Sequence, residues 1–116
     1  MYTASFAAVP YVIKAIASSP GRVTEVNFHF AAWIEICRYK GGLYVADELS
    51  AAYFDALNRV PALAAGVPKM QWDTPFMACA LSAIAAAKGE HELAEALLDL
   101  GSQDTVAEFL AWSYDL

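Results

Sequence analysis

Two histidines and the acids around one of them are the first candidates for chemistry in this chain. His91 stands between Glu90 and Glu92, and Glu95 follows at i+4 on the same side of a helix. A metal centre needs several ligands that converge on one point. His29 falls on the flank of an earlier helix, and pairing on a helix surface explains the acids around His91 with fewer assumptions. We therefore expect no metal and no other cofactor.

Cysteines and glycines give no stronger signal for catalysis. Cys37 and Cys79 both stand inside apolar helical patterns, which are typical of packing rather than of an activated thiolate. Neither cysteine has the spacing of a metal or redox motif. Gly41-Gly42 lacks the Lys-Ser/Thr of a phosphate-binding loop and precedes no strand. The sequence predicts a protein that is not an enzyme.

Aromatic residues outside the expected core are the candidates for binding. Trp72 lies in the irregular linker 67–73 and is the residue most readily expected at the surface. Trp and Tyr side chains anchor protein interfaces at low entropic cost. The alternative is that Trp72 folds back over the third and fourth helices. The candidate protein-binding residues are Trp72, Asp73, Tyr44, Tyr53 and Trp112.

The charge of the chain limits its partners. Seven Lys and Arg against thirteen Asp and Glu give a formal net charge of -6 at pH 7. Residues 90–116 carry seven acids and no Lys or Arg. An acidic surface repels phosphate backbones, so we expect no direct nucleic-acid binding. It can attract a basic protein, although a merely solvated acidic surface is the plainer interpretation.

Nothing in the sequence predicts a membrane segment or a leader. The apolar start of the chain lacks the basic residues that open a signal peptide, and Pro10 and Lys14 interrupt it. No uncharged run reaches the roughly 18 residues of a membrane span. Two cysteines do not form a disulfide framework. We expect a cytoplasmic protein with no membrane partner.

Turn signals divide the chain into six expected helices, and no strand is expected because no segment alternates apolar and polar residues. Pro61 is expected to stop or bend the third helix, and Asp73 or Thr74 to cap the fourth. Ser102 should cap the last helix, with Val106 and Phe109-Leu110 facing inward. The sequence predicts one all-α domain over 1–116, with helices at about 3–18, 20–39, 45–60, 74–88, 90–100 and 102–114.

The second predicted helix carries two apolar stripes. A helix that lies on a single core needs only one such stripe, so we expect neighbours on both sides. Trp33 is assigned to the core. The first stripe holds Val23, Val26, Phe30, Trp33, Ile34 and Cys37, and the nearly opposite one holds Phe28, Ala32, Ile36 and Tyr39.

Short connections imply antiparallel neighbours and therefore three helical hairpins. Two arrangements satisfy this pattern: a short α-solenoid of stacked pairs, similar to HEAT or tetratricopeptide arrays, or a closed helical bundle. The two-sided second helix favours the solenoid, because each pair then buries a face against the next.

Two segments resemble known repeat families. The opening Tyr2-Thr3-Ala4-Ser5-Phe6-Ala7-Ala8-Val9-Pro10-Tyr11-Val12 resembles a segment of bacterial HEAT-like helical-repeat proteins, in which AAVP leads into a helix. Further along, Gly89, Glu90, Ala94 and Leu98 resemble one tetratricopeptide-like helix–turn–helix, without the Trp, Leu-Gly and Tyr of its first helix. The resemblance implies an αα-repeat protein that acts as a binding scaffold and specifies no chemistry.

We therefore expect a helical-repeat module that binds another protein. One specific form is an immunity-type partner, whose acidic surface neutralises a basic bacterial protein. Self-assembly into a homodimer is the alternative, because the end faces of a short solenoid must be covered. A small-molecule pocket between helices, involving Tyr53, Trp72 or Cys37, is the third hypothesis.

Overall fold

The computed structural model describes residues 2–68 and 71–115, so two residues of the predicted linker lie outside it. Its secondary structure confirms the all-α class, and the described residues contain no strand. None of the described helices is both long and apolar enough to cross a membrane. The elements are α1 (Tyr2–Ser18), a 3₁₀ turn (Pro20–Arg22), α2 (Glu25–Gly41), α3 (Asp47–Ala65), α4 (Thr74–Ala87), α5 (His91–Asp99) and α6 (Gln103–Tyr114).

α2 begins five residues later than the sequence predicts. Pro20 opens a separate 3₁₀ turn, and Thr24 then caps α2. The backbone N–H of Thr24 donates to Asn27 Oδ1 at 2.9 Å, which forms one half of a capping box. At the other end, Gly42 adopts a left-handed conformation with φ 61° and ends the helix as expected.

α3 continues through Pro61, so the predicted stop at that residue is wrong. Proline removes a single backbone hydrogen bond, and the packing of the following turn can offset that loss. Val60 and Ala64 flank Pro61 on the buried side of the helix. α1 likewise continues through Pro10.

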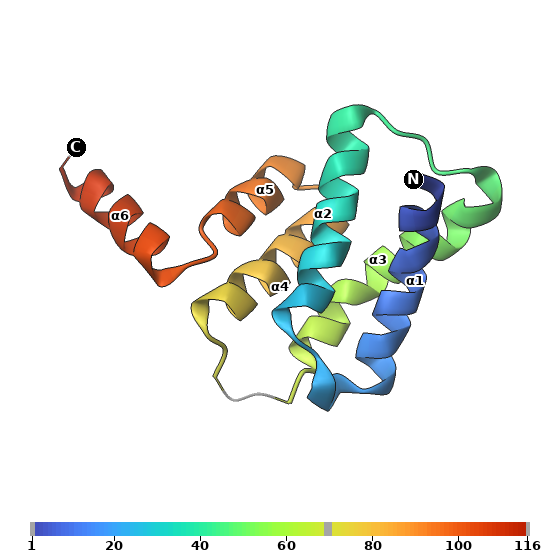
Figure 1. Cartoon of the computed structure of the whole chain (residues 1–116), viewed down its shortest axis with the longest axis horizontal. Helices are drawn as coiled ribbons and strands as arrows, with labels where there is room; N and C mark the ends of the chain where they lie inside the picture. The colour runs from blue at the N-terminus through green and yellow to red at the C-terminus, as the bar shows by residue number, and fades with distance from the viewer. Residues whose placement is uncertain (1, 69–70, 116) are drawn as a thin grey trace.

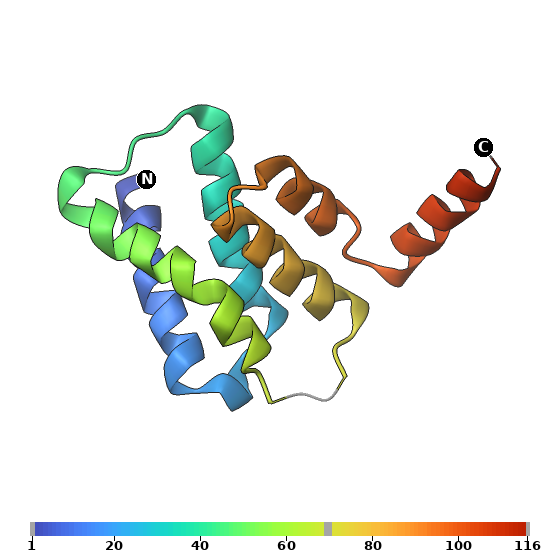
Figure 2. The ribbon, with the colours of Figure 1, turned by 180° about the vertical axis from the view of Figure 1, so that it is seen from behind.

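The first four helices form two stacked hairpins. α1 packs against α2 and α3, while α4 packs against α2, α3 and α5 (Figures 1 and 2). α4 is rich in buried alanines, including Ala80 and Ala83, which let neighbouring backbones approach closely. Stacked hairpins of this kind occur both in a short solenoid and in a closed bundle.

α2 has neighbours on more than one side, but its two predicted stripes are not equally buried. Phe28, Ala32 and Ile36 are almost completely buried, as the second stripe predicts. Tyr39 at the end of that stripe is 54% exposed, so its placement in a buried stripe is wrong. Trp33 is 47% exposed and Val26 is 68% exposed, so their assignment to a buried stripe is wrong. α2 packs against α1, α4 and α5, and no described helix covers the part of its surface that carries Val26 and Trp33.

α6 projects away from the other five helices and forms one end of the long axis of the molecule (Figures 1 and 2). It has no buried residue and makes almost no contact with the rest of the chain. The third predicted hairpin, which would pair α5 with α6, is therefore wrong. The predicted inward orientation of Phe109 and Leu110 is therefore wrong, because these side chains are 48% and 42% exposed. Ser102 caps α6 as expected, accepting a hydrogen bond from the backbone N–H of Thr105 at 3.1 Å.

Candidate functional site

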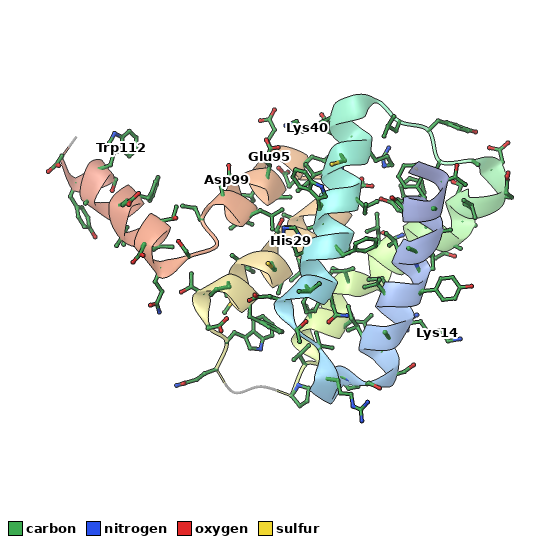
Figure 3. The ribbon with its side chains drawn as sticks, in the orientation of Figure 1. Lys14, His29, Lys40, Glu95, Asp99 and Trp112 are labelled. Atoms are coloured by element: carbon green, nitrogen blue, oxygen red, sulfur yellow. The ribbon has the colours of Figure 1, made fainter. Side chains whose placement is uncertain are left out.

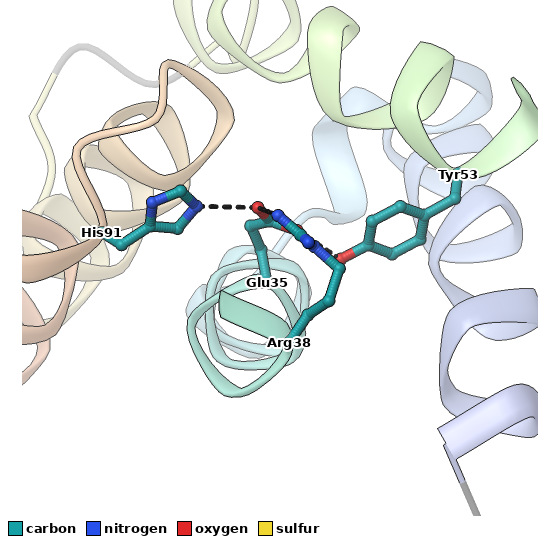
Figure 4. Close-up of polar contacts among 4 residues, drawn as sticks. All are labelled: Glu35, Arg38, Tyr53 and His91. Carbon is teal, nitrogen blue, oxygen red and sulfur yellow. Dashed lines mark hydrogen bonds and ion pairs between the residues drawn. The ribbon is translucent and has the colours of Figure 1, made fainter. Parts of the chain in front are cut away.

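A buried carboxylate in the middle of α2 is the polar centre of the molecule. Glu35 is only 3% exposed, and each of its two carboxylate oxygens accepts two hydrogen bonds (Figure 4). Arg38 Nε and Tyr53 Oη donate to Oε1 at 2.7 and 2.8 Å. Arg38 Nη2 and His91 Nε2 donate to Oε2 at 2.7 and 2.8 Å. Three helices, α2, α3 and α5, therefore meet at one carboxylate.

Helical spacing brings these side chains together. Glu35 and Arg38 are three residues apart on α2, so they lie on the same side of that helix. Tyr53 is in the middle of the buried stripe of α3, and its ring packs edge-on against Phe6 of α1. His91 is the first residue of α5 and reaches back towards α2.

The donors around Glu35 keep its carboxylate ionised. Burial raises the pKa of Glu35, but hydrogen bonds from Arg38, His91 and Tyr53 outweigh that effect and hold the pKa below its ordinary value. Burial and the neighbouring carboxylate raise the pKa of Tyr53, so its phenol stays protonated. The ion pair with Glu35 also raises the pKa of Arg38.

Glu35 with Arg38, Tyr53 and His91, here called the joint, is better suited to holding helices together than to acting as a catalytic base. A carboxylate that accepts four hydrogen bonds has no lone pair left to take a proton from a substrate. An ionised carboxylate can only accept hydrogen bonds. The hydrogen bond between Glu35 and His91 is therefore donated by the Nε2–H of His91. The centre fixes the positions of α3 and α5 relative to α2.

A cavity of about 380 Å³ opens on the outer side of His91. Its lining residues are Tyr39, Lys40, His91, Glu92 and Glu95. The Tyr39 ring stacks on the His91 ring, with centroids 4.0 Å apart and planes 4° from parallel. Lys40 Nζ of α2 lies 2.7 Å from Glu95 Oε2 of α5 (Figure 3). The cavity thus combines an aromatic wall with charges of both signs.

The predicted protein-binding residues do not form one surface. Tyr44 and Trp112 are 77% and 59% exposed, as a contact residue requires, but Tyr44 lies in the loop between α2 and α3 and Trp112 on the projecting α6 (Figures 1 and 3). Tyr53 is fully buried and offers no surface to a partner, because its hydroxyl serves Glu35. Tyr44 donates a hydrogen bond to Asp47, and this bond raises the pKa of Tyr44.

Trp72 and Asp73 have structural contacts at the start of α4. Trp72 is half-buried and packs on Phe76, with ring centroids 4.8 Å apart, which corresponds to the alternative in which it folds back. Asp73 caps α4 by accepting a hydrogen bond from the backbone N–H of Phe76 at 2.9 Å. Its side chain is still exposed at the surface.

His91 differs most from the sequence interpretation, which gave it surface pairing with nearby acids. Its side chain is 11% exposed and pairs with the buried Glu35 instead. The sequence did contain a signal for this contact, because Glu35 falls between Ala31-Ala32 and Ile36 on the buried side of α2. A charge inside an apolar pattern needs partners, and the pattern alone does not say which ones.

No group of three or more metal-ligating side chains converges within residues 2–68 and 71–115. Cys79 is buried, and burial raises the pKa of its thiol. The chain matches no protein-family model, no curated protein and no solved structure.

Proposed function

We propose that this chain is a non-enzymatic, HEAT-like αα-repeat module that binds a basic protein through its C-terminal helices. The binding surface is the acidic end, defined as residues 90–115 with α5 and α6. One observation carries the proposal: residues 90–115 hold seven acids and no Lys or Arg, beside exposed apolar side chains. The acids are Glu90, Glu92, Glu95, Asp99, Asp104, Glu108 and Asp115.

Exposed apolar side chains beside these acids favour a protein partner over small counter-ions alone. Phe109 and Trp112 of α6 lie with ring centroids 5.9 Å apart, and Trp112 is 59% exposed. Tyr114 on the same helix is 81% exposed. Exposed aromatic residues bordered by charge are the composition from which protein interfaces draw most of their affinity. Opposite charge on the partner would steer association and make it salt-dependent.

The test is a comparison of matched charge variants as bait in a lysate of the source organism. The first bait, the α6 variant, carries Asp104→Asn and Glu108→Gln on α6 and Asp115→Asn at its C-cap. The control carries Asp47→Asn, Glu48→Gln and Asp55→Asn on α3. All six side chains are exposed. We expect a basic protein to bind the wild-type chain and the control in equimolar amount, and to be lost from the α6 variant and at high salt. Equal capture by both variants would contradict the proposal.

Self-association through α6 is a second candidate, supported by apolar side chains that nothing covers in the single chain. Leu93 of α5 is 52% exposed, and Met77 and Leu81 of α4 are about as exposed as Leu110 of α6. Two copies could cover these surfaces for each other. Light scattering distinguishes the two candidates, because a monomer at high protein concentration contradicts self-association and leaves binding of a basic protein in place.

A further inference from the structure

We propose that the cavity beside His91 receives an arginine side chain of the basic partner, an inference that rests on the proposed function. The site consists of Tyr39, the carboxylates of Glu92 and Glu95, and the cavity of about 380 Å³ that these residues line. The arginine displaces the chain's own Lys40 from Glu95.

Lys40 is the observation that identifies the ligand as a cation. Its ammonium lies 2.7 Å from Glu95 Oε2, so this cavity already holds a positive group supplied from α2. Both partners of the ion pair are solvent-exposed, at 61% and 37% of their side-chain surface. An exposed ion pair contributes little to stability and exchanges readily. The chain's own lysine thus occupies the place that a partner's cation can take.

The aromatic wall is already held in place for stacking. One face of the Tyr39 ring covers His91, whose Nε2 is bonded to the buried Glu35. This chain of contacts fixes the ring, while Tyr39 as a whole remains 54% exposed. A cation placed over a tyrosine ring is attracted by the electrons of its face. Because the ring is already ordered in the free protein, binding costs little further conformational entropy at Tyr39.

Arginine fits this geometry better than lysine does. A guanidinium is planar, so it can lie flat on the Tyr39 ring and still direct several N–H groups sideways. Glu92 and Glu95 are three residues apart on α5 and line the same cavity. In the described part of the chain, Glu92 makes no hydrogen bond or ion pair, so its carboxylate is available as a second acceptor. Lysine offers only a compact charge with no plane to stack.

The experiment is an NMR titration of the full chain with N-acetylated tri-arginine amide at low ionic strength. We expect saturable shifts of the Tyr39 and His91 ring resonances, with weaker shifts for tri-lysine amide and none for inorganic phosphate. Lys40→Met should tighten tri-arginine binding by about 2- to 5-fold, because it frees Glu95. Glu92→Gln with Glu95→Gln should abolish the ring shifts.

Tyr39 provides a matched pair of variants. Tyr39→Phe keeps the ring and should keep the affinity, whereas Tyr39→Leu removes the stacking surface and should weaken tri-arginine binding. The backbone amide resonances of the second half of α5, away from the substituted ring, show in the free variants whether α5 is still in place. Weaker binding with these amide resonances unchanged supports the stacking role, and unchanged affinity of Tyr39→Leu overturns it.

Two further outcomes would overturn the site in distinguishable ways. Ring shifts with phosphate that disappear in Lys40→Met would show an anion site instead. Tri-arginine shifts confined to α6 would remove this cavity but leave the proposed binding of a basic protein in place. No response anywhere in the acidic end would remove both proposals.

Discussion

The stacked hairpins α1–α4 and the acidic end differ in how much apolar surface they bury. The hairpins bury a continuous apolar core, with side chains such as Phe28, Ile36 and Val60 almost completely inaccessible to solvent. The acidic end buries only Ala94 completely, and Leu97 and Leu98 of α5 are partly buried against the core. Two polar contacts add to this smaller apolar contact in placing α5. Ser82 of α4 donates to the backbone carbonyl of Ala94 at 2.6 Å, and His91 bonds to Glu35.

This difference assigns separate tasks to the two regions. Apolar packing is strong and indifferent to charge, so it makes a rigid base. Polar contacts are specific in geometry, and they place a charged surface at a defined position on that base. Glu35 is the point where the two regions meet, because it belongs to α2 but holds His91 of α5.

The largest effect should follow from removing Glu35. Glu35→Ala leaves Arg38, Tyr53 and His91 without their common acceptor, and we expect it to lower the free energy of unfolding by about 3–5 kcal/mol. Urea denaturation followed by far-ultraviolet circular dichroism measures this loss. Glu108→Ala on α6 is the control and should change stability by less than about 0.5 kcal/mol. A loss below about 1 kcal/mol for Glu35→Ala would contradict the role of this residue as the joint.

A second comparison places the same substitution in both regions. Ala80 of α4 is fully buried where α4 packs against its neighbours, so Ala80→Leu should cost about 1–3 kcal/mol through overpacking. Ala111 of α6 is exposed, and Ala111→Leu should be nearly neutral. Thermal unfolding of the two variants tests the pair. If Ala111→Leu is the more destabilising of the two, α6 must be packed in solution.

Such contrasts also show how far the sequence predicts the molecule. Periodicity predicts six helices, and local chemistry predicts the caps at Asp73 and Ser102, because both depend on residues close in the chain. Helical spacing cannot tell whether a stripe is covered by another helix, and for that reason it misplaces Trp33 and Phe109. The polar centre depends on contacts between residues up to 56 positions apart, such as Glu35 and His91.

The joint also predicts how stability depends on acid. The pKa of Glu35 lies below its ordinary value of 4.5 in the folded chain, so the unfolded chain binds a proton at this carboxyl more readily. The contribution of Glu35 is therefore complete above pH 4.5 and is lost as the pH falls below that value and through the folded pKa. The stability lost by protonating Glu35 is only part of the stability lost in Glu35→Ala. We expect the free energy of unfolding of Glu35→Gln to fall less steeply with acid than that of the wild-type chain, and parallel curves would contradict this linkage.

The smallest effect on stability should come from α6, and the reason connects this helix to binding. A helix of 12 residues with no buried side chain receives little support from the rest of the fold, and an isolated helix of that length is marginal in water. We expect truncation after Gly101 to change the free energy of unfolding by less than about 1 kcal/mol.

In hydrogen exchange, amides of α6 should exchange with little protection, while those of α2 and α4 should be protected to nearly the global free energy of unfolding. A partner that covers Phe109 and Trp112 would raise the protection of α6 selectively. Protection of α6 that grows with the concentration of the chain alone would instead favour self-association as the way in which this surface is covered.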